Sequence, residues 1–383
     1  MYKEVELSEI ADFISGFAFS SSKFIFEKTE SSLPIIRIQN VNSGEEEFVF
    51  WEEAYNEKFL VNKGDLLLSM SGDFKIRIWD KEPALLNQRI VKIIPKEEVN
   101  LDYMLFLIEN KIDELTNLGK KSIISNLSLE DLKKLKVNIP TSKELQRSIA
   151  SKLNKVIDIM NKRQSQITAL DELTQSVFLK TFRNEMKSNM VELGNVLESL
   201  KYGTSEKSTK EGYPVLRIPN IKNGEIDETD LKFCDLKDKA YQSYRLETGD
   251  ILFVRSNGNQ SYVGRCATVS FKQEGYIYAS YLIRVKVKST IAKPEFISYY
   301  LNTRFGRKDV LKKARTSAGQ YNINTKGLSE LRIPLPSIDK QREFVDFANS
   351  IRNKKDELKQ SLNSMEELYN SLLKKAFKGK LFK

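Results

Sequence analysis

A seven-residue sequence occurs twice in the chain, as PIIRIQN at positions 34–40 and as PVLRIPN at positions 214–220. Four further matches lie in the same order around the two copies. They are VEL at 5–7 and 191–193, a Gly-Glu pair at 44–45 and 224–225, GDLL at 64–67 with GDIL at 249–252, and a Gln-Arg pair at 146–147 and 341–342. A period of about 190 residues indicates two copies of a whole domain rather than a solenoid.

The two copies share a framework but differ in their loops, because their offset changes from 180 residues at the quoted stretch to 195–196 near the end of each copy. The largest difference lies in residues 69–85 against 255–277. Short β-branched and aromatic runs punctuated by Gly, Asn and Pro predict strands. We expect them at 33–41, 65–70, 89–94, 215–221, 250–255 and 281–287, with one helix at 102–117 and one at 293–313.

Each copy ends in a long stretch without Pro or Gly, in which apolar residues recur at alternating spacings of four and three. The stripe positions are Ile149, Leu153, Val156, Met160, Ile167, Leu170 and Val177, and then Phe344, Ile351, Leu358, Leu362, Met365, Tyr369 and Leu372. This is the period of a coiled coil, and each helix would be roughly 50–60 Å long. A stripe can also face its own domain, but a domain of this size is only about 30 Å across. We therefore expect the two stripes to pack on each other.

The sequence predicts an α+β fold with two tandem mixed α/β domains, separated by a long antiparallel coiled-coil pair in a pseudo-twofold dumbbell. The expected boundaries are 1–142 for the first mixed domain, 143–187 for a central spacer helix, 188–337 for the second mixed domain and 338–383 for a C-terminal spacer helix.

Composition excludes several classes of function. The 383 residues include no histidine and only two cysteines, so Ser-His-Asp and Cys-His catalysis, HExxH zinc sites and Cys-based zinc clusters are excluded. Walker A and GxGxxG loops are absent, as are the Asn-Pro-Pro-aromatic and Asp-Pro-Pro-aromatic tetrapeptides of amino-methyltransferases. With no signal-peptide core and no membrane-length apolar run, we expect a cytoplasmic binding protein without a metal site.

The net charge of +10 is compatible with a nucleic acid partner, although the segments 141–187 and 338–383 carry +8 of it. Polar loops in the mixed domains are more informative, because Arg, Asn and Gln side chains read base edges and Lys and Ser bind phosphates. Ordinary polar turns are the alternative interpretation. The candidate DNA contacts are Ser71, Lys75, Arg77, Lys120 and Lys121 in the first copy, and Arg255, Asn257, Asn259, Gln260, Tyr262, Arg315, Ser317, Gln320 and Asn322 in the second.

The layout resembles the specificity (S) subunit of type I restriction–modification systems, in which two target-recognition domains alternate with two long helical regions. LRIPLPSIDKQ at 331–341 is similar to that family's junction between domain and helix, and GQYNIN at 319–324 is similar to the segment before it. The helix ends at 173–182 and 368–377 are also similar. The family's Glu-Gln pair is Lys340-Gln341 here, and NIPT at 138–141 is a degraded junction.

The resemblance implies a non-catalytic subunit in which each domain reads one half of an asymmetric, interrupted DNA site. The helices would set the gap and dock two methyltransferase (M) subunits, and two restriction (R) subunits could join. S-adenosylmethionine, ATP and Mg²⁺ would then bind the partners, and this chain would bind no cofactor. Two alternatives stay open: a coiled-coil scaffold or RNA-binding adaptor without DNA sequence specificity, and a metal-dependent nuclease or methyltransferase.

Overall fold

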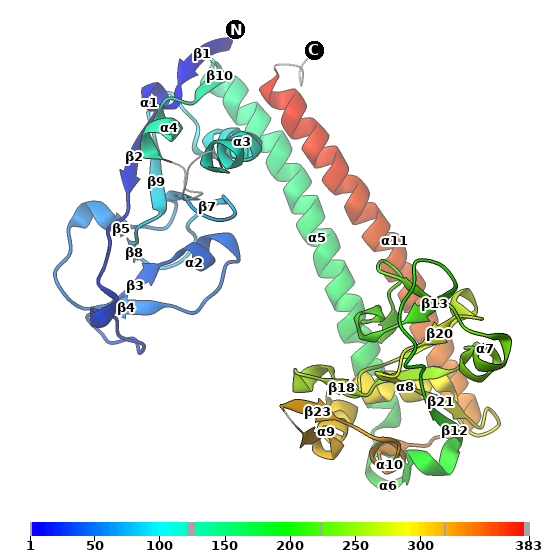
Figure 1. Ribbon diagram of the computed structural model, residues 1–383. Coiled ribbons are helices and arrows are strands. Elements are labelled where there is room, and N and C mark those ends of the chain that lie inside the picture. Colours follow the sequence, from blue (N-terminus) through cyan, green and yellow to red (C-terminus); the bar gives the residue numbers. More distant parts are fainter. Residues whose placement is uncertain (1, 121–127, 223, 318, 379–383) are drawn as a thin grey trace. The chain divides into compact units, whose positions relative to one another are not determined.

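A computed structural model describes residues 2–120, 128–222, 224–317 and 319–378 of the chain (Figure 1). The chain forms two compact units, one comprising residues 1–165 and 360–383 and the other residues 166–359. Each unit contains one mixed α/β domain together with a stretch of each long helix, α5 (Lys143–Phe182) and α11 (Ile338–Phe377). The predicted fold class, with two mixed domains and two long helices, is confirmed.

The first domain is built on two small sheets. One is antiparallel, in the order β2 (Ala11–Ser15), β9 (Ile90–Pro95), β6 (Leu66–Ser69) and β7 (Ile76–Ile78). The other has the order β4 (Val49–Trp51), β3 (Leu33–Ile36), β8 (Ala84–Leu86) and β5 (Leu60–Val61), with β3 and β8 parallel. A separate pair joins β1 (Tyr2–Glu6) to β10 (Lys136–Pro140). All four residues of β6 are buried, which explains its unbroken apolar run.

The second domain repeats this plan. Its antiparallel sheet has the order β12 (Leu197–Tyr202), β21 (Leu282–Val287), β17 (Ile251–Val254) and β19 (Cys266–Thr268). The next sheet has the order β16 (Lys232–Cys234), β13 (Tyr213–Leu216) and β20 (Ile277–Tyr278), and β11 (Met190–Glu192) pairs with β24 (Arg332–Pro334). The equivalent strand orders establish the duplication in three dimensions.

Short helical segments and small β pairs connect these sheets. In the first unit they are α1 (Leu7–Ile10), η1 (Ser21–Lys23), α2 (Ile38–Asn42), η2 (Glu57–Phe59) and α4 (Leu129–Lys133). In the second they are α6 (Glu185–Ser188), η3 (Leu193–Val196), η4 (Ile218–Asn220), β14 (Ile221–Lys222), β15 (Glu225–Ile226), α7 (Asp238–Tyr244), η5 (Gln260–Tyr262), η6 (Phe271–Gln273) and α10 (Thr325–Ser329).

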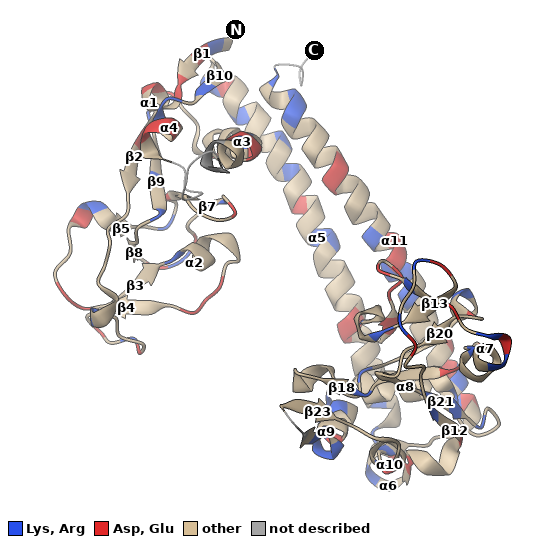
Figure 2. Cartoon of the chain, in the orientation of Figure 1, with Lys and Arg blue, Asp and Glu red and all other residues tan. Residues whose placement is uncertain are grey.

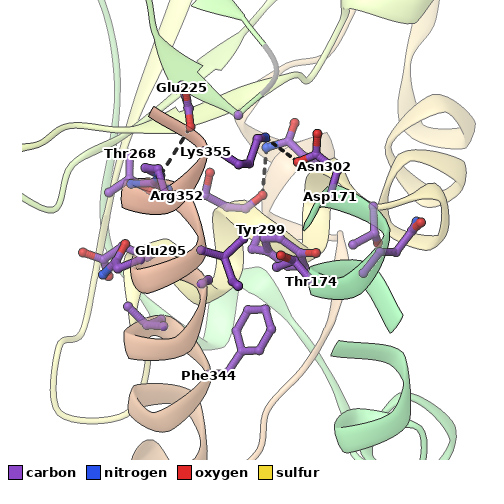
Figure 3. A pocket seen from close by; sticks show the side chains of 18 of the residues that line it. Asp171, Thr174, Glu225, Thr268, Glu295, Tyr299, Asn302, Phe344, Arg352 and Lys355 are labelled. Atoms are coloured by element: carbon purple, nitrogen blue, oxygen red, sulfur yellow. Dashed lines mark hydrogen bonds and ion pairs between the residues drawn. The ribbon is translucent and has the colours of Figure 1, made fainter. Parts of the chain in front are cut away.

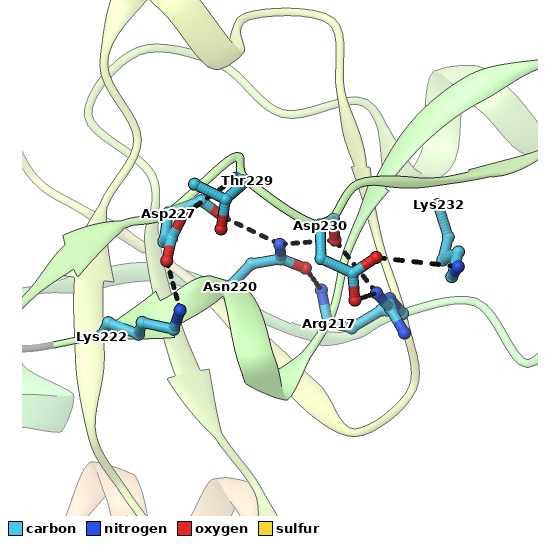
Figure 4. Close-up of polar contacts among 7 residues, drawn as sticks. All are labelled: Arg217, Asn220, Lys222, Asp227, Thr229, Asp230 and Lys232. Atoms are coloured by element: carbon cyan, nitrogen blue, oxygen red, sulfur yellow. Dashed lines mark hydrogen bonds and ion pairs between the residues drawn. The ribbon is translucent and has the colours of Figure 1, made fainter. Parts of the chain in front are cut away.

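The strands predicted at 33–41 and 215–221 end earlier than expected, at Ile36 and Leu216. The cause is an asparagine that turns the chain. The Asn220 Oδ1 atom accepts the Arg217 N–H at 2.8 Å, and its Nδ2 donates to the carbonyl oxygens of Asp227 and Asp230 (Figure 4). Asn40 makes the equivalent bond to the Arg37 N–H, also at 2.8 Å. The repeated Arg-x-x-Asn pattern therefore encodes a turn.

Charged side chains reinforce the second copy of this turn. The Arg217 Nη2 atom lies 2.9 Å from the Asp230 carboxylate, which also lies 3.6 Å from the Lys232 ammonium (Figure 4). The neighbouring Asp227 bonds to Lys222, and this hydrogen bond is the main reason that the pKa of Asp227 lies well below its usual value. These charged side chains pair with one another and so stabilise the loop that follows β13.

The repeated Gly-Asp pair also forms a turn. Gly64 and Gly249 have φ values of 100° and 91°, which lie in the region that favours glycine. The Asp65 carboxylate accepts the Asn62 N–H at 2.8 Å, and Asp250 accepts the Glu247 N–H at 2.9 Å. Burial raises the pKa of Asp250. Both carboxylates thus close the turn that leads into the central strand of each domain.

The two repeated glutamines fasten each domain to the start of its long helix. Gln341 is fully buried; its Oε1 accepts the Lys293 N–H at 2.8 Å, and its Nε2 donates to the carbonyl oxygens of Ile291 and Pro336 at 3.0 and 2.9 Å. Gln146 makes the equivalent three bonds, to Asn100, Glu98 and Pro140. The two glutamines therefore have the same structural role in the two copies, which is to join a domain to its long helix.

The single helix predicted at 293–313 is wrong, because two helices occupy this stretch: α8 (Pro294–Asn302) and α9 (Arg304–Lys313). Thr303 interrupts them as an N-cap whose side chain accepts the Gly306 N–H. A β-carbon on Gly306 would lie 2.4 Å from the Tyr300 carbonyl oxygen, so only glycine allows this close approach. The first domain has one continuous helix here, α3 (Leu101–Lys120).

The apolar stripes of α5 and α11 pack on each other in each unit, and also on the adjacent domain. Ile149 and Leu153 share the first core with Tyr369 and Leu373, while Phe178 shares the second core with other aromatic residues. Each stripe therefore packs both on the other long helix and on its adjacent domain, so both interpretations of the stripe hold. Residues of both charge signs follow one another along the helices (Figure 2). No described helix is long and apolar enough to span a membrane.

Candidate nucleic-acid interface

The two polar clusters predicted in the second copy lie side by side. A small antiparallel sheet joins them, in the order β18 (Ser256–Asn257), β23 (Gln320–Asn322) and β22 (Arg315–Ser317). Ser256 pairs with Asn322, and Asn257 pairs with Tyr321. The Ile323 N–H donates to the Arg255 carbonyl oxygen at 2.9 Å. Segments about 60 residues apart in sequence therefore form one surface of the second domain.

Arg255 is held on this surface by a backbone hydrogen bond and by an aromatic ring. Its N–H donates to the Tyr281 carbonyl oxygen at 2.8 Å, and its guanidinium carbon lies 4.9 Å from the centre of the Tyr202 ring. The side chain is half-buried and forms no ion pair with any described residue. A stacked guanidinium whose hydrogen-bond donors are not neutralised by a carboxylate is suited to a base edge or a phosphate.

The loop after Arg255 is held by its own asparagines. The Oδ1 atom of Asn257 accepts the Asn259 N–H at 2.8 Å, and the Oδ1 atom of Asn259 accepts the Ser261 N–H at 2.9 Å. Asn257 is half-buried, whereas Asn259 and Gln260 are exposed. These bonds use the side-chain oxygens for the turn, so that base recognition by either asparagine would depend on its NH₂ group.

Tyr262 and the hairpin β22–β23 complete the surface. The Tyr262 ring is 39% exposed and lies under the Arg265 guanidinium, 4.0 Å from its carbon. Arg315 and Gln320 are exposed, and the half-buried Asn322 donates from Nδ2 to the Gln320 carbonyl oxygen at 3.3 Å. Ser317 ends β22, and its side chain lies outside the described residues. The second-copy candidates therefore gather on one polar surface.

The first-copy candidates differ from one another in burial and in the groups that they contact. Ser71 is buried, and the half-buried Arg77 points a guanidinium nitrogen at the Asn40 carbonyl oxygen, 3.5 Å away. Lys75 is exposed in the hairpin between β6 and β7. Lys120 ends α3, and Lys121 lies outside the described residues. Of this set, Lys75 is the described side chain best placed to meet a partner.

Two side chains of this surface were missed by sequence reasoning. Tyr202 supports Arg255 from the end of β12, which is more than 50 residues away in sequence, and no local pattern marks that contact. Arg265 lies in the segment where the two copies differ most in length, so only the hydrogen bonds of the structure align it with Lys75. The Ser69 N–H donates to the Lys75 carbonyl oxygen, and the equivalent Val254 N–H donates to that of Arg265, so the two cations occupy the same place.

A separate cavity of about 370 Å³ lies in the second unit among α5, α8 and α11 (Figure 3). Its charges are largely paired: Lys355 bonds to Asp171, and the Arg352 guanidinium lies 3.3 Å from the Glu225 carboxylate. Burial raises the pKa of Tyr299, which contributes to the cavity wall. Lys355 takes an otherwise apolar stripe position, so its ion pair helps to define the helix register.

Both cysteine thiols are buried. Burial raises the pKa of the Cys266 thiol to about 11, and it also raises the pKa of the Cys234 thiol. A thiol with a raised pKa is a poor nucleophile at neutral pH. Among the described residues, no group of three or more Cys, Asp or Glu side chains is arranged to hold a metal ion.

Two repeated domains with paired long helices, and a polar loop surface on the second domain, are typical of a tandem-domain binding protein. Its family is shown by sequence: the model of the type I restriction modification DNA specificity domain matches residues 1–169 and again residues 185–367. The chain belongs to this family, and the resemblance noted from the junction motifs is confirmed.

Individual relatives agree. The chain is 25% identical over 417 residues to the type I restriction enzyme EcoBI specificity subunit of Escherichia coli, covering 98% of this chain and 85% of that one. The type I restriction–modification S subunit from M. genitalium superposes with a TM-score of 0.57 at 17% identity, covering 98% and 96% of the two chains. A chain from a study of complex assembly and conformational transition of the type I R-M system gives 0.58 at 15% identity, with 99% and 98% covered.

Proposed function

We propose that this chain is the sequence-recognition subunit of a type I restriction–modification complex in the cytoplasm. Each mixed domain would read one half of an asymmetric, bipartite site in double-stranded DNA. The observation that carries the proposal is the duplication itself: one framework occurs twice, with different side chains on its loops. Two unlike copies of one domain suit a site whose halves differ in sequence.

The helices would set the distance between the half-sites and dock two methyltransferase (M) subunits, and two restriction (R) subunits could join them. Their paired stripes and the domain-to-helix bonds of Gln146 and Gln341 support a stiff connection. The chain itself would be non-catalytic and bind no cofactor. S-adenosylmethionine, ATP and Mg²⁺ would act on the partner subunits, where a target adenine is taken out of the stack and methylated.

The direct test compares N6-methyladenine maps of cells that contain the chain and its methyltransferase with cells that lack only the chain. The proposal predicts that methylation at one interrupted, asymmetric motif disappears. An unchanged map, with the methyltransferase active, would contradict it and favour a scaffold or RNA-binding adaptor. Purified chain incubated with DNA and either Mg²⁺ or S-adenosylmethionine should show no turnover, and turnover abolished by a single carboxylate substitution would indicate an enzyme.

The spacer role has its own test. Residues 156–162 and 351–357 form one heptad in each long helix. Deleting both should change the gap between the half-sites, or abolish methylation, while each half-site sequence stays the same. An active variant with an unchanged gap would refute the role of the helices in spacing.

A further inference from the structure

The ends of the central strands provide an exact alignment of three positions in the two domains. In the first domain the Met70 N–H donates to the Arg89 carbonyl oxygen at 2.7 Å, and in the second the Arg255 N–H donates to that of Tyr281 at 2.8 Å. The strand pairings just before these bonds agree, because Ser69 opposes Ile90 where Val254 opposes Leu282. Position 70 therefore corresponds to 255, and position 89 to 281.

Each domain places one arginine at this pair of positions, but from opposite strands. In the second domain Arg255 extends the central strand β17, and the facing residue, Tyr281, is 59% exposed. In the first domain the central strand continues into Met70, which is 6% exposed, and the exposed arginine is Arg89, directly before β9. Each sheet therefore carries one arginine at this end, but Arg255 extends β17 whereas Arg89 precedes β9.

The backbone of Arg89 indicates that its side chain matters. Its φ of 68° makes it the only described residue other than glycine with a positive φ. A left-handed backbone is unfavourable for a long side chain, and glycine or asparagine would fill such a turn with less strain. Strain held at an exposed position is typical of a functional site. Like Arg255, Arg89 forms no ion pair with a described residue.

The third position is basic in both domains. Lys75 and Arg265 are equivalent, and each lies on the strand-end hairpin beside the central strand, opposite the strand that carries position 89 or 281. The first domain therefore presents Lys75 and Arg89, and the second presents Arg255 and Arg265. The first pair flanks the central strand, and the second pair lies on the central strand and its neighbour. Two cations at one end of a sheet suit a DNA groove, where one can bind a phosphate and the other a base edge.

We propose that Arg89 is a specificity-determining DNA contact of the first domain, with the role that Arg255 has in the second, and that each contacts a guanine edge in the major groove. The strand exchange of the arginine is then one physical reason why the two half-sites differ. This inference rests on the proposed function, because it assumes that the domains read DNA. Guanine is favoured because a guanidinium donates two parallel hydrogen bonds to its O6 and N7 atoms.

The test uses the full chain with its methyltransferase partner and the variants Arg89→Gly and Arg255→Ala. Methylation maps and binding to duplexes with single base changes are the readouts. We expect Arg89→Gly to relax one guanine position in one half-site, reducing discrimination there about 5- to 150-fold. Arg255→Ala should relax a guanine in the other half-site only. Arg89→Lys should weaken this discrimination, because an ammonium lacks the planar fork that donates two parallel hydrogen bonds.

The control is Lys96→Ala, a charge removal beyond the opposite end of β9, where the Lys96 ammonium donates to the Ser8 carbonyl oxygen at 3.3 Å. It should leave the motif unchanged. Because glycine suits the turn, Arg89→Gly should fold as stably as the wild type. An unchanged motif in Arg89→Gly, or a loss of affinity that is uniform across all sequences, would overturn the inference while leaving the proposed function intact. A wild-type chain that directs no bipartite motif would instead overturn the proposed function.

Discussion

The substitution Gln341→Leu tests whether this repeated glutamine fastens the second domain to the start of α11. Leucine has nearly the volume of glutamine but makes none of its three hydrogen bonds, with oxygen or nitrogen partners at 2.8, 2.9 and 3.0 Å. The partners are backbone groups of Lys293, Pro336 and Ile291, which would be left unpaired. At about 1–1.5 kcal/mol for each bond, the free energy of unfolding should fall by about 3–4.5 kcal/mol. For a unit of this size the melting temperature should drop by about 6–18 °C.

The assay is thermal unfolding of the full-length chain, combined with amide hydrogen exchange at Lys293, whose N–H loses its acceptor. Gln360→Leu makes the same chemical change at an exposed position of α11 and should shift the melting temperature by less than about 2 °C. Gln146→Leu should produce the same loss as Gln341→Leu, but in the first unit. A shift below about 2 °C for Gln341→Leu, with unchanged exchange at Lys293, would show that these three hydrogen bonds do not stabilise the second unit.

Three further predictions concern the second unit. Phe344→Ala removes a ring that lies 5.0 Å from Phe178 and 4.9 Å from Tyr299, and should cost about 3–5 kcal/mol in a denaturant titration. A cost below 1 kcal/mol would contradict the packing described. Gly203→Ala would place a methyl group 2.3 Å from the Ala279 carbonyl oxygen, so we expect a loss of about 1–3 kcal/mol and a local shift visible by NMR or crystallography. Cys266 should resist Ellman's reagent at pH 8 until guanidinium is added, since it is buried with a raised pKa; rapid labelling of the native thiol would be incompatible with that burial.

The duplication and the long helices could be predicted because both leave regular traces in the sequence. The 4,3 spacing places Ile149 on the apolar face of α5 and Leu358 on the apolar face of α11, and both side chains are buried. The boundaries of the shorter helices and strands could not be predicted as well from the sequence. The segment 33–41 is rich in β-branched residues and is therefore predicted as one strand, but the Asn40 side chain turns the chain at Arg37. Thr303 caps a second helix within 293–313.

The candidate surface could be predicted only in part. The loops around Arg255 and Gln320 were both identified, but their pairing through β18 and β23 depends on tertiary structure. Polar type alone also could not separate a side chain that faces a partner from one that faces its own domain, as Ser71 and Arg77 illustrate. Arg89 went unnoticed because its position at the strand end becomes visible only when the hydrogen bonds of the two copies are compared.

Each domain should read its own half of a DNA site. This is tested by replacing residues 190–335 with the corresponding domain of another specificity subunit and mapping N6-methyladenine in cells that contain the methyltransferase. We expect a new motif in which one half is unchanged and the other is that of the donor. A motif altered in both halves, from an active and folded chain, would show that the domains do not read their half-sites independently.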